Sequence, residues 1–222
     1  MKKVVIILGL LATASILAIA SRQQWQKIPK SLSQNSSLLS PLQFDELKKE
    51  LDAINPQGET NGGSYSEFSD PENKFKIQYP SDWLAIKDET ILGGLISEGA
   101  KEKFNLRALF LAQGLQKDNF GQIIFARGIF NMTPEKIIEV MQKDNQEQGW
   151  QMEIIRGDIQ ENEGTFEIKY QTSTGQLLHS KERVWTKGQD AYLLSFVVFE
   201  KDWEEFGEKA DFAISASQVL TK

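Results

Sequence analysis

The stretch of sequence that decides the fold reads Phe75-Lys76-Ile77-Gln78-Tyr79-Pro80-Ser81-Asp82-Trp83. Apolar and polar side chains alternate over residues 75–79, which is the pattern of a β-strand with one face in a core. Pro80 has no backbone N–H and ends such a strand, and Trp83 is large enough to fill a core position just beyond it. We therefore expect the globular domain to span residues 68–222.

Further strands follow along the chain. The alternation recurs at 165–170, and three segments are apolar on both faces: 106–112, 123–130 and 191–199. A strand with two apolar faces is typical of the middle of a sheet that is covered on both sides. Turn-forming residues separate the last four predicted strands, which are 150–156, 165–172, 177–186 and 192–199. This spacing predicts a four-strand antiparallel meander.

Two helices are available to cover this sheet. Thr133 is expected to cap the first, with Pro134 at its first position and Gly149 as its left-handed stop. The second begins after Asp202, whose spacing to Glu205 is typical of a capping box. The order of strands, helix, meander and helix predicts an α+β domain with a mostly antiparallel sheet flanked by helices.

The first 22 residues have the features of an export segment. Lys2 and Lys3 precede an apolar run from Val4 to Ala20. The run is at the lower limit of a membrane-spanning helix, about 17 residues, and slightly longer than a usual signal-peptide core. A cleaved signal peptide and an uncleaved membrane anchor both remain open. Either one predicts a domain that is exported to the periplasm, the cell exterior or, in a photosynthetic host, the thylakoid lumen.

Residues 23–67 are polar and predict a tether between this segment and the domain. The tether is interrupted at 44–54, where Phe44, Leu47 and Leu51 recur at helical spacing. This stripe predicts a short amphipathic helix. It either packs back on the domain or docks on a partner.

Composition excludes several classes of function. The chain has 222 residues, a formal net charge of -6, no cysteine and one histidine. The negative charge argues against a nucleic-acid partner. Without cysteine there is no disulfide, no thiolate nucleophile and no cysteine-based metal site.

No catalytic motif is recognised, so the sequence predicts that the protein is not an enzyme. It contains no Gly-x-Ser-x-Gly elbow and no phosphate-binding loop. The single histidine, His179, is expected to be exposed on a strand that also carries Lys181 and Arg183 on the same face; a role in metal or anion binding is the alternative. The acidic segment 158–164 is expected to be a solvated turn rather than a calcium loop.

The residues from Phe68 to Trp83 resemble the opening of PsbP-type domains, in which a Phe-x-Ile-x-Tyr-Pro strand leads to a tryptophan. The end of the chain is similar as well, with Tyr192 and Phe196 on a strand, then Trp203 and a last helix. This resemblance implies an α/β/α sandwich, and in the best-known members an extrinsic subunit of photosystem II that helps to retain calcium and chloride. Calcium enters the expectation through this resemblance alone, and no cofactor is predicted from the residues.

Two functional hypotheses follow. The first is a membrane-associated accessory domain that binds or stabilises a membrane protein complex; the second is an extracytoplasmic cation- or small-ligand-binding module. Two groups of residues are candidates for partner contact. They are the acidic residues Glu204, Glu205 and Glu208 of the last helix and the apolar residues Phe44, Leu47 and Leu51 of the tether. No metal-ligating residue is singled out.

Export gives the first testable prediction. If residues 4–20 direct export, protease added to intact spheroplasts should digest the domain, or the domain should be recovered in the extracytoplasmic fraction. Complete protection until the cells are lysed would contradict the prediction.

Overall fold

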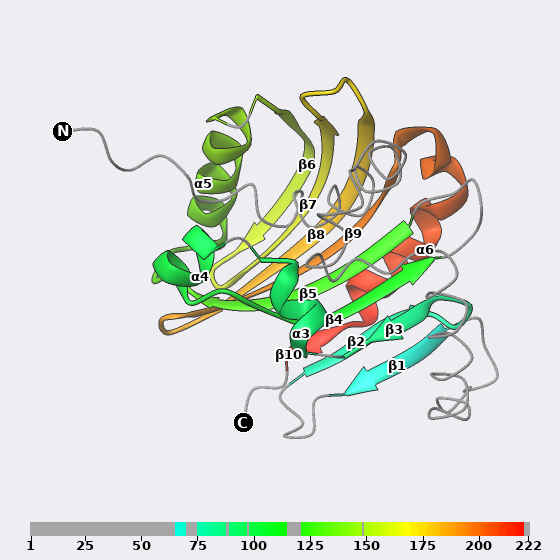
Figure 1. Ribbon diagram of the computed structural model, residues 1–222, viewed down its shortest axis with the longest axis horizontal. Coiled ribbons are helices and arrows are strands. Elements are labelled where there is room, and N and C mark those ends of the chain that lie inside the picture. Colours follow the sequence, from blue (N-terminus) through cyan, green and yellow to red (C-terminus); the bar gives the residue numbers. More distant parts are fainter. Residues whose placement is uncertain are drawn as a thin grey trace, which may run out of the picture.

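A computed structural model describes residues 65–69, 75–87, 89–96, 98–114, 121–147 and 149–219 (Figure 1). The predicted export segment 1–22 lies outside the described residues. The tether residues Phe44, Leu47 and Leu51 lie outside them as well.

A seven-stranded antiparallel sheet forms the centre of the fold, with the strand order β3-β4-β5-β9-β8-β7-β6. Its strands are β3 (Leu84–Ile86), β4 (Arg107–Gly114), β5 (Gly121–Ile129), β6 (Gln151–Gln160), β7 (Glu163–Gln171), β8 (Leu177–Lys187) and β9 (Asp190–Phe199). The predicted meander is confirmed by the consecutive pairing of β6 to β9. The segments that are apolar on both faces form β4, β5 and β9, which lie inside the sheet.

A second sheet of three strands covers one face of the first. It consists of β1 (Tyr65–Ser69), β2 (Phe75–Pro80) and β10 (Gln218–Val219), in the order β1-β2-β10. The decisive alternating strand of the sequence, β2, is therefore at the centre of this smaller sheet. Its residues Phe75, Ile77 and Tyr79 are buried against the larger sheet and against α6 (Trp203–Ala216). A short 3₁₀ turn, η1 (Glu200–Asp202), leads into α6.

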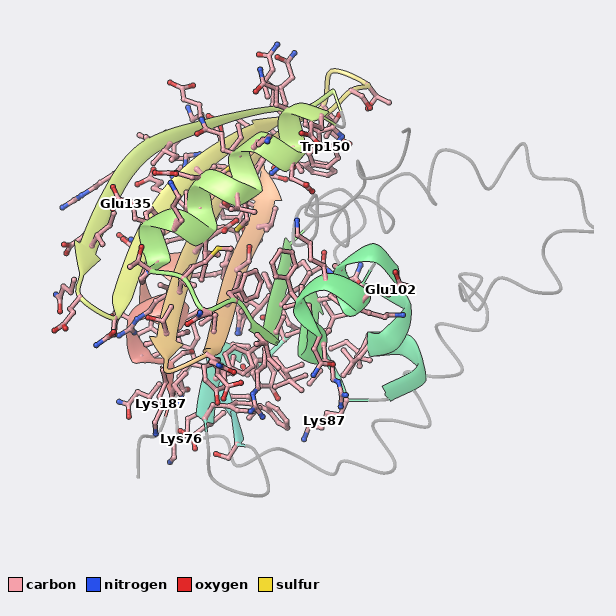
Figure 2. All side chains as sticks on the ribbon, turned by 90° about the vertical axis from the view of Figure 1, so that its left-hand side faces the viewer. Lys76, Lys87, Glu102, Glu135, Trp150 and Lys187 are labelled. Atoms are coloured by element: carbon pink, nitrogen blue, oxygen red, sulfur yellow. The ribbon has the colours of Figure 1, made fainter. Side chains whose placement is uncertain are left out.

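Helices cover the other face. They are α3 (Glu89–Gly94), α4 (Glu98–Phe104) and α5 (Pro134–Glu147). Figure 2 shows α5 lying across the sheet between the labelled Glu135 and Trp150, with α4 beside it at Glu102. The α+β class with helices flanking an antiparallel sheet is thus confirmed. The structure adds α3 and α4, whose six and seven residues are too short to give a helical period in the sequence.

The start of α5 follows the expected capping pattern, whereas the start of α6 does not. The Lys136 backbone N–H donates to Thr133 Oγ1 at 3.4 Å, and Gly149 has a φ of +79° just after the helix. The predicted capping box at Asp202 and Glu205 is wrong. Asp202 has a helical conformation and makes no capping bond with its side chain, because η1 runs directly into α6 and the last extended residue before it is Phe199.

Trp83 joins the two sheets, as its predicted core position requires. Its ring is 6% exposed and packs against Phe196 and Phe206, with ring centroids 5.1 Å and 6.1 Å away. The ring also lies on Gly114 and Gly121, where neighbouring β4 and β5 lack side chains. A Cβ atom at Gly121 would lie 2.5 Å from Trp83 Cζ2.

This close approach predicts that Gly121→Ala destabilises the fold. The added methyl group must displace the indole ring from a packed core, which costs about 1–3 kcal/mol. Gly93→Ala is the matched control, since a Cβ atom at that position meets no atom within 4 Å. Chemical denaturation of both variants checks the prediction. Equal free energies of unfolding for the two variants would contradict it.

Candidate functional site

The candidate site is the outer face of α6, and its geometry depends on how the sheet holds this helix. His179 on β8 is central. Its ring is stacked on Trp203, the first residue of α6, with ring centroids 3.6 Å apart and an interplanar angle of 5°. His179 Nδ1 lies 2.8 Å from Glu200 Oε2, and Nε2 lies 2.9 Å from Glu167 Oε1. One imidazole thus connects β7, η1 and the start of α6.

The expectation that His179 is exposed is wrong, because its side chain is only 3% exposed. The strand assignment and the shared face with Lys181 and Arg183 hold, but Trp203 covers the ring. Sequence spacing gave no signal of this contact, since His179 and Trp203 are brought together only by the return of α6 onto the sheet. The two carboxylates accept hydrogen bonds and cannot donate them, so both contacts are satisfied together when both ring nitrogens carry a proton.

Arg183 holds the other end of α6. Its Nη1 donates to the backbone carbonyls of Ile214, Ser215 and Ser217 at 2.9–3.3 Å. A cation at the carboxyl end of a helix satisfies carbonyls that have no partner within the helix and is favoured by the helix dipole. Arg183 also forms an ion pair with Glu163 on β7, at 2.6 Å.

A charged groove of about 340 Å³ runs between α6 and the strands β6 to β8. Its charged lining consists of Arg156, Asp158, Glu163, Glu167, Lys181, Arg183 and Asp211. Lys181 pairs with Asp211 of α6. Burial lowers the pKa of Lys181, Glu167 opposes this effect, and Arg156 lowers the pKa further. The groove therefore contains an ion-paired seam that joins the middle of α6 to the sheet.

The solvent-exposed side of α6 carries the predicted contact residues. Glu204, Glu205 and Glu208 are all exposed, and so is Asp211 at the edge of the groove, one turn after Glu208. Phe212 is 43% exposed beside them, and its ring centroid lies 4.1 Å from that of Tyr65 on β1. The structure thus brings the three glutamates together and adds an aromatic pair that the sequence analysis did not single out.

A second polar cluster is buried on the face of the sheet that packs against α5. Glu182 Oε1 accepts hydrogen bonds from the hydroxyls of Tyr170, Ser180 and Ser195 at 2.7, 3.2 and 3.3 Å. Burial raises the pKa of Glu182, and these hydrogen bonds partly oppose the effect. The sequence analysis missed this cluster, although Glu182 occurs in a strand where every second side chain enters the core.

Two further findings concern metal binding and membrane-spanning helices. Among the described residues, no three acidic or histidine side chains are grouped so that they could hold a metal ion. No helix in the described part of the chain is long and apolar enough to cross a membrane.

No protein-family model and no curated protein matches the chain. The solved structures that it resembles include cyanobacterial PsbP (CyanoP) from Synechocystis sp. PCC 6803, with 14% identity, 74% of this chain and 97% of that chain covered, and a TM-score of 0.49. The Saccharomyces cerevisiae Ran-binding protein Mog1p has 10% identity, 70% and 95% coverage and a TM-score of 0.45. LpqN, involved in cell envelope biogenesis of Mycobacterium tuberculosis, has 11% identity, 71% and 91% coverage and a TM-score of 0.44. A solved PsbP is thus among the structures to which this chain is similar.

The contacts of His179 predict the effect of replacing it. His179→Phe retains a flat ring against Trp203 but removes the hydrogen bonds to Glu167 and Glu200. We expect the free energy of unfolding to fall by about 1–3 kcal/mol and the amides of η1 and α6 to exchange faster with deuterium. Leu177→Phe is the control on the same strand, because Leu177 is 52% exposed. If α6 keeps its wild-type exchange rates in His179→Phe, the imidazole contacts do not hold the helix.

Proposed function

We propose that the protein is a non-enzymatic accessory domain on the outer side of a membrane, and that it binds a membrane protein or complex through the outer face of α6. The observation that carries this proposal is a helix held to the sheet at its start, middle and end, whose outer side presents three exposed glutamates and a partly exposed phenylalanine.

A helix held in this way suits protein recognition. Its backbone is ordered before binding, so association loses less conformational entropy than it would with a loose segment. Glu204, Glu205 and Glu208 favour a basic surface on the partner and accelerate encounter with it. Phe212 supplies apolar area next to these charges, and aromatic side chains contribute strongly when a partner covers them.

The N-terminal sequence supports the location. Residues 4–20 would hold the chain at the membrane if they stay attached, and the polar residues 23–67 would separate the domain from the lipid surface. Tethering raises the effective concentration of the domain at the membrane, so a modest affinity for the partner is sufficient. In a photosynthetic host, the finer role implied by the resemblance is that of an extrinsic subunit of a photosystem II-type complex.

Binding of a cation or small ligand is the second candidate function. The observation that favours it is the charged groove between α6 and β6 to β8. Three carboxylates and two cations of the groove already form ion pairs or hydrogen bonds inside the protein. A ligand would therefore have to replace existing contacts, and we rank this function below protein binding.

The proposal predicts the outcome of crosslinking in intact membranes. The wild-type chain should give a discrete adduct with another protein. Reversing Glu204, Glu205 and Glu208 to lysine should reduce its yield about tenfold or more, because three attractive charges become repulsive. Lysine at the exposed glutamates Glu102, Glu135 and Glu147, on α4 and α5, is the matched control and should leave the adduct unchanged.

Two results would contradict the proposal. One is the absence of any heteromeric adduct in membranes from the native host. The other is equal loss of adduct in both triple variants, which would assign the effect to net charge rather than to α6. A shift of the melting temperature by calcium alone would favour the ligand-binding candidate.

A further inference from the structure

The strand β6 forms an open edge of the seven-stranded sheet. In the described part of the chain it pairs with β7 alone. Nine of its ten residues are exposed. Three of them are large apolar residues, Ile154, Ile155 and Ile159, with 40%, 45% and 46% of their surface exposed. An edge of this length presents backbone N–H and C=O groups that can pair with another strand.

A bulge determines which way the side chains of β6 point. The pairing with β7 passes from Ile154 opposite Ile168 to Arg156 opposite Glu167, so Ile155 is the extra residue. From Arg156 to Gln160 the register is regular. Arg156 and Asp158 line the groove on the side of α6. By alternation over this regular stretch, Gly157 and Ile159 lie on the side of α5.

The segment from Ile155 to Ile159 is self-complementary in antiparallel pairing. With Gly157 opposite Gly157 of a second copy, Arg156 lies opposite Asp158 and Ile155 opposite Ile159, and each of these two pairs occurs twice. Arg156 and Asp158 are on the same face of the sheet, as cross-strand neighbours must be. We infer that β6 is a homodimerisation edge, at which two copies of this chain join their seven-stranded sheets around a two-fold axis at Gly157.

Apolar burial, charge pairing and backbone packing all favour a second copy of this chain at β6. Pairing covers the exposed Ile159 on the side of α5 and places opposite charges next to each other on the side of α6. Gly157 carries no side chain at the axis, where the two strands approach each other. The interface uses the same patch on both copies, so association ends at the dimer.

The charges also select the partner. An unrelated strand meets a positive and a negative side chain two residues apart, and this arrangement disfavours most sequences, as charged edge residues commonly do. A second copy in the antiparallel register meets its exact complement. The inference does not rest on the α6 proposal, because β6 lies at the edge of the sheet and the contact glutamates lie on the outer side of α6.

Charge reversal gives a decisive experiment on the full chain in detergent solution. Wild-type protein carrying two different tags should co-purify with itself. R156D places two acidic residues opposite each other at both pairs, and D158R places two basic residues there, so each variant should self-associate about tenfold or more weakly. A mixture of R156D and D158R restores opposite charges at both pairs and should associate like wild type. The double variant R156D/D158R should do so as well.

E102R is the matched control, since Glu102 is exposed on α4 and lies away from β6 in Figure 2. It should co-purify like wild type, which shows that a surface charge reversal as such does not weaken association.

Two outcomes would overturn the inference. The first is a wild-type chain that is monomeric at micromolar concentration. The second is a mixture of R156D and D158R that associates no better than either variant alone.

Discussion

The contact between the Trp83 ring and the glycines of β4 and β5 is the constraint on which the two-sheet arrangement depends. Trp83 follows β2 of the small sheet, and Gly114 and Gly121 belong to the large one, so the thickness of one indole ring sets the distance between the sheets at this point. The ring also contacts Phe206 of α6. Helix and small sheet thus share one core against the same face.

Polar contacts of α6 fix its position in addition to the packing of this core. Apolar packing attaches the inner side of the helix through residues such as Phe206 and Ala210, but it does not determine the helix position along the strands in detail. The stack of Trp203 on His179 and the carbonyl contacts of Arg183 lie at opposite ends of the helix and are directional. They determine which side of α6 faces solvent, and hence where its glutamates are presented.

The strands of the large sheet were predictable because their signals are local. Alternation in residues 165–170 and the apolar run in 191–199 identify β7 and β9 without tertiary information. The pairing of β2 with β10, far apart in sequence, left no comparable local signal, and the short α3 and α4 left none either. The same distinction between local and tertiary signals applies to the candidate site. The exposure of its glutamates follows from helical spacing, whereas the burial of His179 depends on a partner 24 positions further along, at Trp203.

The charged side chains of this fold differ in how many hydrogen bonds and ion pairs they form inside the molecule. His179 and Arg183 each have several partners on neighbouring elements. Giving up these contacts in order to bind another molecule would therefore gain little free energy. Arg156 and Asp158 lie exposed on an edge strand whose outer backbone groups have no strand beside them in the described structure. Since backbone groups and side chains at that edge favour the same antiparallel neighbour, the two requirements reinforce each other. This agreement between hydrogen bonding, charge and apolar burial makes the β6 edge an association surface rather than merely a solvated rim.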